Sequence, residues 1–561
     1  MNTNTRKTEM TEETMTVHAA IARTLKDLGV DTLFGLMGDS NLFMCDNYVR
    51  EQGGRYVPAT HEANAVLMAC GHAAMTGDIG VCTITQGPAV SNALTALIEG
   101  VKSSQRVVLL CGDTPMADPD HPQTIQQRVL IEGTGAGYLR FRSTETIVED
   151  IVHAFRRAWI ERRPIALNMP TEMMWEMTTY RGVKPPNRPA PVAPTDGEAM
   201  DNAIGIIAAA RRPVVLAGRG AVHAKDALVR LADRIGAPLC TTLKAKGLFN
   251  EHTYNLGVHG TLSTPGAIDV ISSSDCVIVF GAGLNRFTQA GGAFFEGRRV
   301  IHVDEMEASV GRYIEPDAAI YADPALVADA FVGWLDEAEI PSSQSTDTID
   351  PDALKEPTPL PPESKAEGTV DFPRALNRIN AAMDPERLFI TDAGRFLQEA
   401  WWRIDVTKPA NMLLSIGVGA IGMGMGHAVG AGVARPGQPI LYVTGDGGLM
   451  MGGLAEITSV VREKLDMIML ICNDAAYGAE YVQFEDRQMD PGMSQFEWPS
   501  LAGIARSMGV KGMRVTSNAE LDDAVAAIEA YKPGDGPMVV EMMLDPAAIT
   551  RLHLAAQAPA K

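Results

Sequence analysis

The chain has 561 residues and a formal net charge of −21, from 48 basic and 69 acidic side chains. This charge argues against anionic partners, so we expect no binding to nucleic acid and none to membrane surfaces. Hydrophobic residues make up 46% of the chain, which is enough for a large interior. At about 150 residues per domain, the length predicts three or four domains.

The cysteines and the N-terminus indicate the cellular compartment. The 7 cysteines are scattered and form no Cys-x-x-Cys pair, which favours reduced thiols in a cytoplasmic protein. The polar N-terminus lacks the apolar segment of a signal peptide. No apolar run approaches the roughly 18 residues that a membrane span needs. We therefore expect a cytoplasmic protein.

Three blocks of alternating strand and helix patterns are separated by two linkers rich in proline and other breakers. The linkers are residues 184–194 and about 340–370, and their composition favours extended tethers. The blocks are therefore 14–183, 195–338 and 371–550. Strands that alternate with helices predict an α/β fold with three doubly wound parallel-sheet domains.

In the first block, two predicted strands end in polar turns. The strand at 56–60 leads to Glu62 at the start of a helix, where the helix dipole favours a carboxylate. An ordinary helix-capping role alone would also explain this Glu. The strand at 81–85 ends in the turn GPAVSN, residues 87–92, which leads into another helix.

The middle block shows the same alternation. A strand at 214–217 ends in the glycine turn 218–220, and further strands are predicted at 277–283 and 300–304. Glycine turns after parallel strands are compatible with a bound dinucleotide, although such a turn alone is a weak signal.

The third block contains the stretch around which the chain is organised. Residues 440–444 predict a buried strand that ends in Gly445-Asp446-Gly447-Gly448, and residues 467–472 predict a second strand that ends at Asn473. The carboxyl ends of neighbouring parallel strands meet at the edge of the sheet where ligands bind.

Oxygen atoms gather at this predicted edge. Asp446 supplies a carboxylate, Asn473 an amide oxygen, and the loop after Asn473 a free carbonyl. Together with phosphate oxygens, such ligands suit an octahedral magnesium ion. The glycines let the backbone approach a diphosphate, and the helix start behind them favours anions. An ordinary β-α-β unit with a glycine turn is the alternative for this motif alone.

Several motifs occur in a characteristic order: Glu62 after a strand, the GPxxxN turn, a proline-rich linker, a middle α/β block, and GDG followed by Asn473. This order resembles the acetolactate synthase/pyruvate oxidase/benzoylformate decarboxylase family of thiamine-diphosphate (ThDP) enzymes, from about residue 14 to 550. The resemblance implies a pyrimidine-binding first domain, a Rossmann-like central domain and a diphosphate-binding third domain.

The resemblance also implies roles for particular residues. Glu62 is the catalytic acid beside the pyrimidine ring of ThDP, and Asp446, Asn473 and the Ala475 carbonyl bind Mg²⁺. The backbone carbonyl of Gly419 holds the amino group of the pyrimidine. The other cofactor contacts that it implies are Gly394, Arg395, Ile421, Gly445, Gly447, Gly448, Tyr477 and Gly478.

The implied activity is that of a ThDP- and Mg²⁺-dependent carbon–carbon lyase or carboligase, acetolactate synthase-like, acting on a 2-oxo acid or related carbonyl substrate. Gln126 resembles a polar contact of acetolactate synthases, although a surface glutamine is an equally good explanation. Asp39, in a GDxNL sequence, resembles the proton-handling Asp of pyruvate decarboxylases. Phe484 stands where acetolactate synthases carry Trp. The chain mixes features of two branches, so we predict a non-standard substrate.

Three alternatives stay open: an FAD-containing 2-oxo acid oxidase, a simple 2-oxo acid decarboxylase and a catalytically silent scaffold protein. The sequence TTL at 241–243 and Asp304 resemble flavin-containing acetolactate synthases, whereas Gly283 replaces an Arg that those enzymes often carry. Glu62, Asp446 and Asn473 are intact, which argues against the scaffold.

Self-association is a further implication of the resemblance. It implies a homodimer, or a homotetramer, in which Glu62 of one subunit meets the Asp446 loop of its partner.

Overall fold

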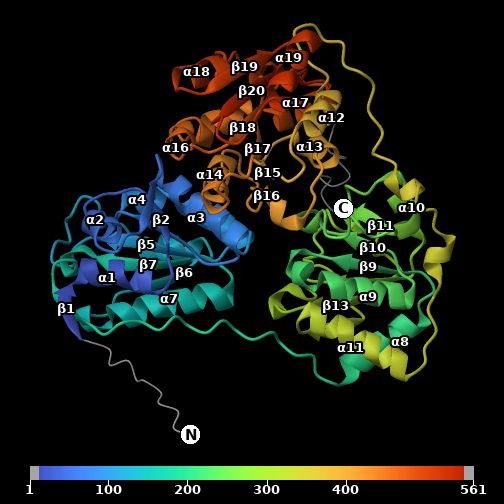
Figure 1. The fold of residues 1–561 in the computed structure, drawn as a ribbon, viewed down its shortest axis with the longest axis horizontal. Coiled ribbons are helices and arrows are strands. Elements are labelled where there is room, and N and C mark those ends of the chain that lie inside the picture. The colour runs from blue at the N-terminus through green and yellow to red at the C-terminus, as the bar shows by residue number, and fades with distance from the viewer. Residues whose placement is uncertain (1–11, 549–561) are drawn as a thin grey trace.

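The computed structural model describes residues 12–548. Three α/β domains follow one another, and each is built around a six-stranded parallel sheet (Figure 1). In Figure 1 the first domain is blue, the middle domain green, and the third orange to red. Apolar clusters cover both faces of each sheet. The predicted fold class is therefore confirmed, and the boundaries at 14–183, 195–338 and 371–550 stay predictions.

The first domain has the strand order β3-β2-β4-β5-β7-β6. Its strands are β2 (Thr32–Gly35), β3 (Arg55–Pro58), β4 (Gly80–Ile84), β5 (Val107–Asp113), β6 (Gly137–Arg140) and β7 (Ile165–Pro170). A short antiparallel pair lies beside them, β1 (Glu13–Thr16) with β8 (Met177–Tyr180). The helices are α1 (Val17–Asp27), α2 (Leu42–Arg50), α3 (Glu62–Thr76), α4 (Pro88–Asn92), α5 (Leu94–Lys102), α6 (Gln127–Gly133) and α7 (Ile147–Glu161).

The middle domain has the strand order β11-β10-β9-β12-β13-β14. Its strands are β9 (Pro213–Ala217), β10 (Leu239–Thr241), β11 (Asn255–Val258), β12 (Cys276–Phe280), β13 (Arg299–Asp304) and β14 (Ala318–Tyr321). The helices are α8 (Glu198–Ala209), α9 (Lys225–Ile235), α10 (Pro265–Ser273) and α11 (Pro324–Glu337). This is the order of a dinucleotide-binding fold, with its switch point between β9 and β12.

The third domain has the strand order β16-β15-β17-β18-β20-β19, which repeats the topology of the first domain. Its strands are β15 (Leu388–Thr391), β16 (Met412–Leu414), β17 (Ile440–Gly445), β18 (Met467–Asn473), β19 (Lys511–Val515) and β20 (Met538–Met543). The helices are α12 (Phe372–Ala382), α13 (Leu397–Arg403), α14 (Gly424–Ala434), α15 (Asp446–Gly448), α16 (Ile457–Arg462), α17 (Gly478–Asp486), α18 (Leu501–Ser507) and α19 (Asn518–Glu529). A π-helical turn, Leu449–Gly453, follows α15.

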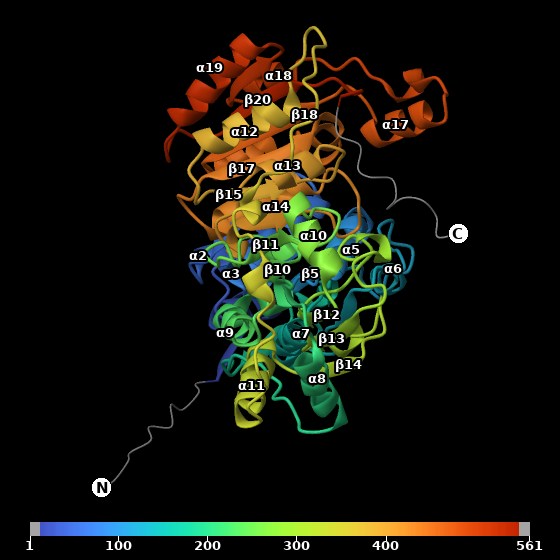
Figure 2. The same cartoon turned by 90° about the vertical axis from the view of Figure 1, so that its right-hand side faces the viewer.

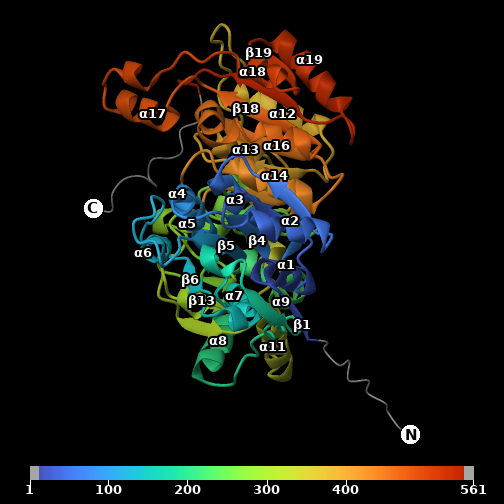
Figure 3. The same cartoon turned by 90° about the vertical axis from the view of Figure 1, so that its left-hand side faces the viewer.

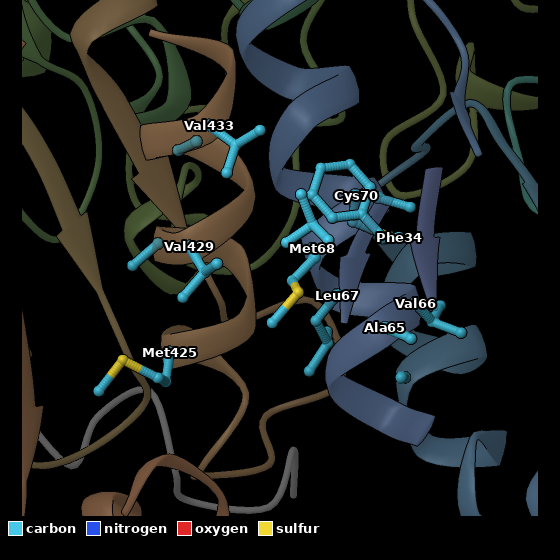
Figure 4. Packing of buried hydrophobic residues seen from close by; sticks show 14 of the residues in the cluster. Phe34, Ala65, Val66, Leu67, Met68, Cys70, Met425, Val429 and Val433 are labelled. Atoms are coloured by element: carbon cyan, nitrogen blue, oxygen red, sulfur yellow. The ribbon is translucent and has the colours of Figure 1, made fainter. Parts of the chain in front are cut away.

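Helices α3 and α14 join the first and third domains. Figure 4 shows Leu67 and Met68 of α3 pointing toward α14, and these side chains belong to one apolar cluster that spans both domains. A Cβ atom on Gly430 would lie 1.9 Å from the carbonyl oxygen of Met68, and one on Gly71 would lie 2.2 Å from that of His427. The absence of a side chain at these glycines therefore permits the close approach.

The middle domain is tied to both of its neighbours by cationic side chains. The Arg219 guanidinium donates to the carbonyl oxygen of Ser103 in the first domain at 2.7 Å. The Lys246 ammonium donates to the carbonyl oxygens of Trp401 and Ile404 in the third domain at 2.5 and 2.8 Å. Burial lowers the pKa of Lys246 to about 8.

The second linker differs from its prediction as a free tether. Leu354 is buried in an apolar cluster of the middle domain, and the Ser343 hydroxyl donates to the Ile235 carbonyl oxygen at 2.7 Å. A few apolar and hydroxyl side chains are thus enough to fix part of a linker whose overall composition is polar. The first linker, in contrast, is extended and largely exposed.

All 7 cysteines are free and buried, as the sequence predicts. Within residues 12–548, no helix combines the length and the apolar content that crossing a bilayer requires.

Candidate active site

The predicted β-α-β unit is formed, and it brings two polar side chains to one edge of the third sheet. Strands β17 and β18 pair in parallel, with Gly445 opposite Cys472. Asp446 begins α15 directly after β17, and Asn473 is the last residue of β18. Both are buried, and both lie at the carboxyl end of their strands, where parallel sheets bind ligands.

Asp446 lies in an environment that opposes its negative charge. It is 3% exposed, and burial raises its pKa to about 6. The indole of Trp498 donates to its Oδ2 at 2.8 Å. The neighbouring Asp474 has a pKa raised to about 7, first by burial and then by the charge of Asp446. A cation at this edge would relieve the unfavourable charge on both carboxylates.

Asn473 is oriented by Glu541, a residue that the sequence analysis missed. Glu541 is fully buried on β20 and accepts from the Asn473 amide at 2.8 Å. The Asn473 Oδ1 therefore faces the loop, where it also accepts from the Ala475 backbone N–H at 3.0 Å. Glu541 lies inside the apolar strand sequence MVVEMM, and this was the available signal, because a buried charge needs partners.

The expectation of a free carbonyl after Asn473 is corrected by the structure. The carbonyl oxygen of Ala475 accepts a hydrogen bond from the Phe496 backbone N–H at 2.8 Å. Ala475 has a φ of +50°, so the chain turns sharply at this point. This hydrogen bond uses one lone pair of the carbonyl oxygen, so a metal would have to bind the other lone pair.

A second missed residue, Asp392, holds the turn before α14. It is fully buried at the end of β15, and its two oxygens accept from the backbone N–H groups of Gly422 (2.9 Å) and Met423 (3.2 Å) and from the Thr444 hydroxyl (3.1 Å). Burial raises its pKa to about 6, and these hydrogen bonds oppose the rise. This single carboxylate fixes the 422–423 turn against β17.

The turn held by Asp392 carries two of the predicted cofactor contacts. Gly419 has a φ of +77°, which glycine adopts without strain, and a Cβ there would meet no atom within 4 Å. A Cβ on Gly447 would meet only the Cδ1 of Ile421, at 3.7 Å. Open space therefore borders both glycine turns, with Ile421 at its side.

The remaining predicted contacts lie around the ends of β15 and β18. The Arg395 guanidinium donates to the carbonyl oxygens of Gly478 (3.1 Å) and Pro546 (2.7 Å). Gly394 directly precedes it, and Tyr477 is 52% exposed, with its ring in T-shaped contact with that of Phe496. Figures 2 and 3 show α17, which begins at Gly478, projecting away from the rest of the domain.

Glu62 begins α3, as predicted, and is half-buried. The Asn92 amide of the GPxxxN turn donates to its Oε2 at 3.1 Å. Two residues further, the Asn64 amide donates to the Gly452 carbonyl oxygen (3.1 Å) and to Glu456 (2.9 Å), both in the segment that follows the GDGG turn. The helix that Glu62 begins therefore contacts the segment after the GDGG turn within one chain, and the meeting of Glu62 with the Asp446 loop of a partner subunit stays a prediction.

The two predicted substrate residues of the first domain, Asp39 and Gln126, are exposed. The buried side chains are those of their neighbours. Ser40 is 3% exposed and contacts Thr85, and Gln127 accepts from the Gly87 N–H at 2.6 Å. The roles of Asp39 and Gln126, which the family resemblance implies, stay predictions.

The middle domain gives mixed signs for a dinucleotide. At the switch point the Gly220 N–H donates to the Gly281 carbonyl oxygen at 3.0 Å, so the two glycine turns touch each other. Asp304 accepts from the Met306 N–H at 2.8 Å. Within residues 12–548, neither ring nitrogen of the buried His302 has a hydrogen-bond partner, and the same holds for His259 Nε2.

The residues of the third-domain edge fit a diphosphate held by a divalent ion. Within residues 12–548, no group of three or more His, Cys, Asp or Glu side chains could bind a metal alone. A metal at Asp446 therefore depends on amide, carbonyl and phosphate oxygens, which is the donor set that magnesium prefers. Few atoms stand against the glycine turns, so the backbone there is open to the approach of a ligand.

The fold and the site together define an enzyme class. Two domains of equal topology meet through α3 and α14. The first domain carries the Glu62 carboxylate at the start of α3, and the third carries an oxygen-lined sheet edge at Asp446 and Asn473. Three family models match the chain: "Thiamine pyrophosphate enzyme, N-terminal TPP binding domain" over residues 15–131, the central domain over 200–331, and the C-terminal TPP binding domain over 392–542. The chain belongs to the thiamine pyrophosphate enzyme family.

Curated relatives resemble the chain over nearly its whole length. An "Acetolactate synthase" of Mycobacterium bovis is 26% identical, covering 94% of this chain and 87% of the relative. A "Probable acetolactate synthase large subunit" of Methanocaldococcus jannaschii is 27% identical, with 94% and 92% covered. The "Acetolactate synthase isozyme 1 large subunit" of Escherichia coli K12 is 26% identical, with 96% and 95% covered.

Proposed function

We propose that the chain is a ThDP- and Mg²⁺-dependent carbon–carbon lyase or carboligase that acts on a 2-oxo acid, in the manner of an acetolactate synthase. The observation that carries the proposal is the meeting of Glu62's helix with the segment behind the GDGG turn, through Asn64 and Glu456. The names of the relatives support the substrate class.

The third domain would hold the cofactor and its metal. Asp446, Asn473 and the second lone pair of the Ala475 carbonyl would bind Mg²⁺, and the N–H groups at the start of α15 would face the diphosphate. The bound cofactor would supply an electron sink for breaking a bond next to a carbonyl group. The further contacts that we propose are Gly394, Arg395, Gly419, Ile421, Gly445, Gly447, Gly448, Tyr477 and Gly478.

Glu62 would act as the acid that holds and releases a proton at the pyrimidine ring. Its Oε2 is hydrogen-bonded by Asn92, so the other carboxyl oxygen can turn toward a ligand. Glu62→Gln keeps the size and the hydrogen bond but removes the acid. We expect the rate to fall by ~10² to 10⁴ while ThDP still binds. Full activity in this variant would contradict the role.

The function is tested by turnover and by metal removal. Purified protein should release carbon dioxide from at least one 2-oxo acid, and coupled products should be detected with 1,2-diketones or a second 2-oxo acid. Chelation should abolish turnover, and ThDP with Mg²⁺ should restore it. Protein that binds ThDP and Mg²⁺ but releases no carbon dioxide from any 2-oxo acid would contradict the proposal.

An FAD-containing 2-oxo acid oxidase is the second candidate, because a polar ligand in the middle domain would pair ring nitrogens of His302 and His259 that have no hydrogen-bond partner within residues 12–548. A flavin spectrum that bleaches on addition of pyruvate would favour it. A simple decarboxylase would instead release an aldehyde as its sole product. The product analysis therefore separates the three reactions.

Self-association and location complete the proposal. We propose a homodimer or homotetramer, because two of the similar proteins are named large subunits. Light scattering that gives the mass of one chain would contradict this. The free, buried thiols support a cytoplasmic location.

A further inference from the structure

Loops of the first domain gather at the sheet edge where Glu62 lies. The strand order β3-β2-β4-β5 places the loops 36–41, 85–87 and 114–126 in a row beside the loop that leads to Glu62. The Asn92 amide, which donates to Glu62, belongs to the helix that follows the 85–87 loop. A substrate held near Glu62 therefore lies within reach of this row.

A chain of side-chain hydrogen bonds crosses these loops. Ser40 Oγ lies 3.1 Å from Thr85 Oγ1, which donates to Gln86 Oε1 at 2.5 Å, and Gln86 Nε2 donates to Gln123 Oε1 at 2.7 Å. Because the Thr85 proton is used toward Gln86, Ser40 must donate to Thr85. All bonds then run in one direction, and Gln123 presents its own NH₂ group at the end.

Close packing holds this chain of bonds in place. Gln86 is 3% exposed. A Cβ on Gly112 would lie 2.0 Å from Ser40 Oγ and 3.0 Å from Gln86 Oε1, and a Cβ on Gly87 would lie 2.1 Å from the Gln123 carbonyl oxygen. Gln123 itself is half-buried, and within residues 12–548 its Nε2 has no acceptor. The loops thus fix a hydrogen-bond donor that has no partner in the part of the chain that the structure describes.

We propose that Gln123, positioned by Gln86, donates a hydrogen bond to the carboxylate of the 2-oxo acid and so favours acids over uncharged carbonyl compounds. This inference rests on the proposed function. A neutral amide suits a carboxylate that leaves as carbon dioxide, because a cation there would stabilise the bound acid more than the transition state. Gln126, the alternative on the same loop, is exposed and lies at the start of α6.

The test compares the kinetics of wild type and single variants, with pyruvate as substrate and methyl pyruvate as its uncharged competitor. Q123L removes the donor at similar size. We expect KM for pyruvate to rise about tenfold, as for one hydrogen bond to a charged group, while kcat and the inhibition constant of methyl pyruvate change little. Q126L, the same change three residues on, should raise KM far less.

A second variant tests the positioning role of Gln86. Q86E still accepts from Thr85 but does not donate to Gln123, so the Gln123 amide should turn and present its oxygen to the substrate. We expect KM for pyruvate to rise at least as much as in Q123L, although residue 86 does not touch the substrate. Unchanged melting temperatures and unchanged ThDP affinity would show that both variants are folded and loaded.

Direct binding separates the failure of this inference from that of the proposed function. Oxamate, a non-reacting analogue of a 2-oxo acid, is titrated into protein loaded with ThDP and Mg²⁺. Equal oxamate affinity in wild type and Q123L, or a larger loss in Q126L, would overturn the inference. Wild type that binds oxamate through Gln123 but turns over no 2-oxo acid would instead refute the proposed function alone.

Discussion

The pairing of α3 with α14 makes a sharp prediction for Gly430→Ala. A Cβ at this position would lie 1.9 Å from the carbonyl oxygen of Met68, whereas real Cβ atoms essentially never approach within 3.0 Å. The obstacle is backbone rather than a flexible side chain. The two helices must therefore separate by about 1 Å at this point, and the contact of Gly71 with the His427 carbonyl oxygen loosens with it.

The size of the effect follows from two opposing terms. Overpacking costs about 1–3 kcal/mol, and the upper end applies here because the contacting atom is backbone. Alanine gains up to about 1 kcal/mol over glycine in helix propensity. The net destabilisation is therefore about 1–2 kcal/mol. It weakens the contact of α3 with α14, which positions Glu62 relative to the third domain. If ThDP needs this interface, its dissociation constant should rise about tenfold.

Thermal melting and ThDP titration measure the two consequences. Gly333→Ala in α11 is the matched control, because a Cβ there would meet no atom within 4 Å. We expect the control to be slightly stabilised and to bind ThDP normally. Gly430→Ala that melts like the control and binds ThDP like wild type would show that the helices are not packed as the structure has them.

Three further variants examine the residues around the predicted metal. Glu541→Gln replaces a carboxylate that accepts hydrogen bonds with an amide, so Asn473 should lose its orientation. Calorimetry should then show the Mg²⁺ affinity falling ~10–100-fold. Unchanged affinity would refute the role of Glu541 in orienting Asn473. Asp392→Asn leaves buried donors without an acceptor and should cost about 1–3 kcal/mol, seen as a lower melting temperature. Mg²⁺ with ThDP should change the fluorescence of Trp498, and Trp498→Phe should abolish that change; the same response in the variant would contradict Asp446 as the ligand.

The local part of the site was predictable because its signals are local. Strand 440–444 could be recognised by its apolar run, and the glycines after it mark a turn where the strand ends. Asp446 and Asn473 then follow from one rule, that parallel strands end at a common edge. The strand pattern at 56–60 and the helix pattern after it placed Glu62 at a helix start, and the structure agrees.

The residues that hold the site in place could not be predicted, because their signals are not local. Asp392 and Glu541 act through hydrogen bonds to segments far away in the chain, and no period of 2 or 3.6 residues encodes such a partner. A lone charge in an apolar strand does signal that a partner exists, but it does not say which one. The sequence also did not indicate that Gln127 is buried and Gln126 exposed, because a shift of one residue decides which side chain points inward.

The glycine-rich run of α14 shows where such reasoning stops. Such a run is typical of a helix that packs closely on its neighbours. In α14, Gly424 and Gly432 lie against Tyr442 and Ile440 of β17 in the sheet, whereas Gly426 and Gly430 lie against α3 of the first domain. A glycine in a helix indicates that another element packs closely there, but it does not identify that element. The position of Glu62 relative to the sheet edge at Asp446 therefore depends on α3 and α14, two helices from different domains, and their contact is the first thing that an experiment on this protein should perturb.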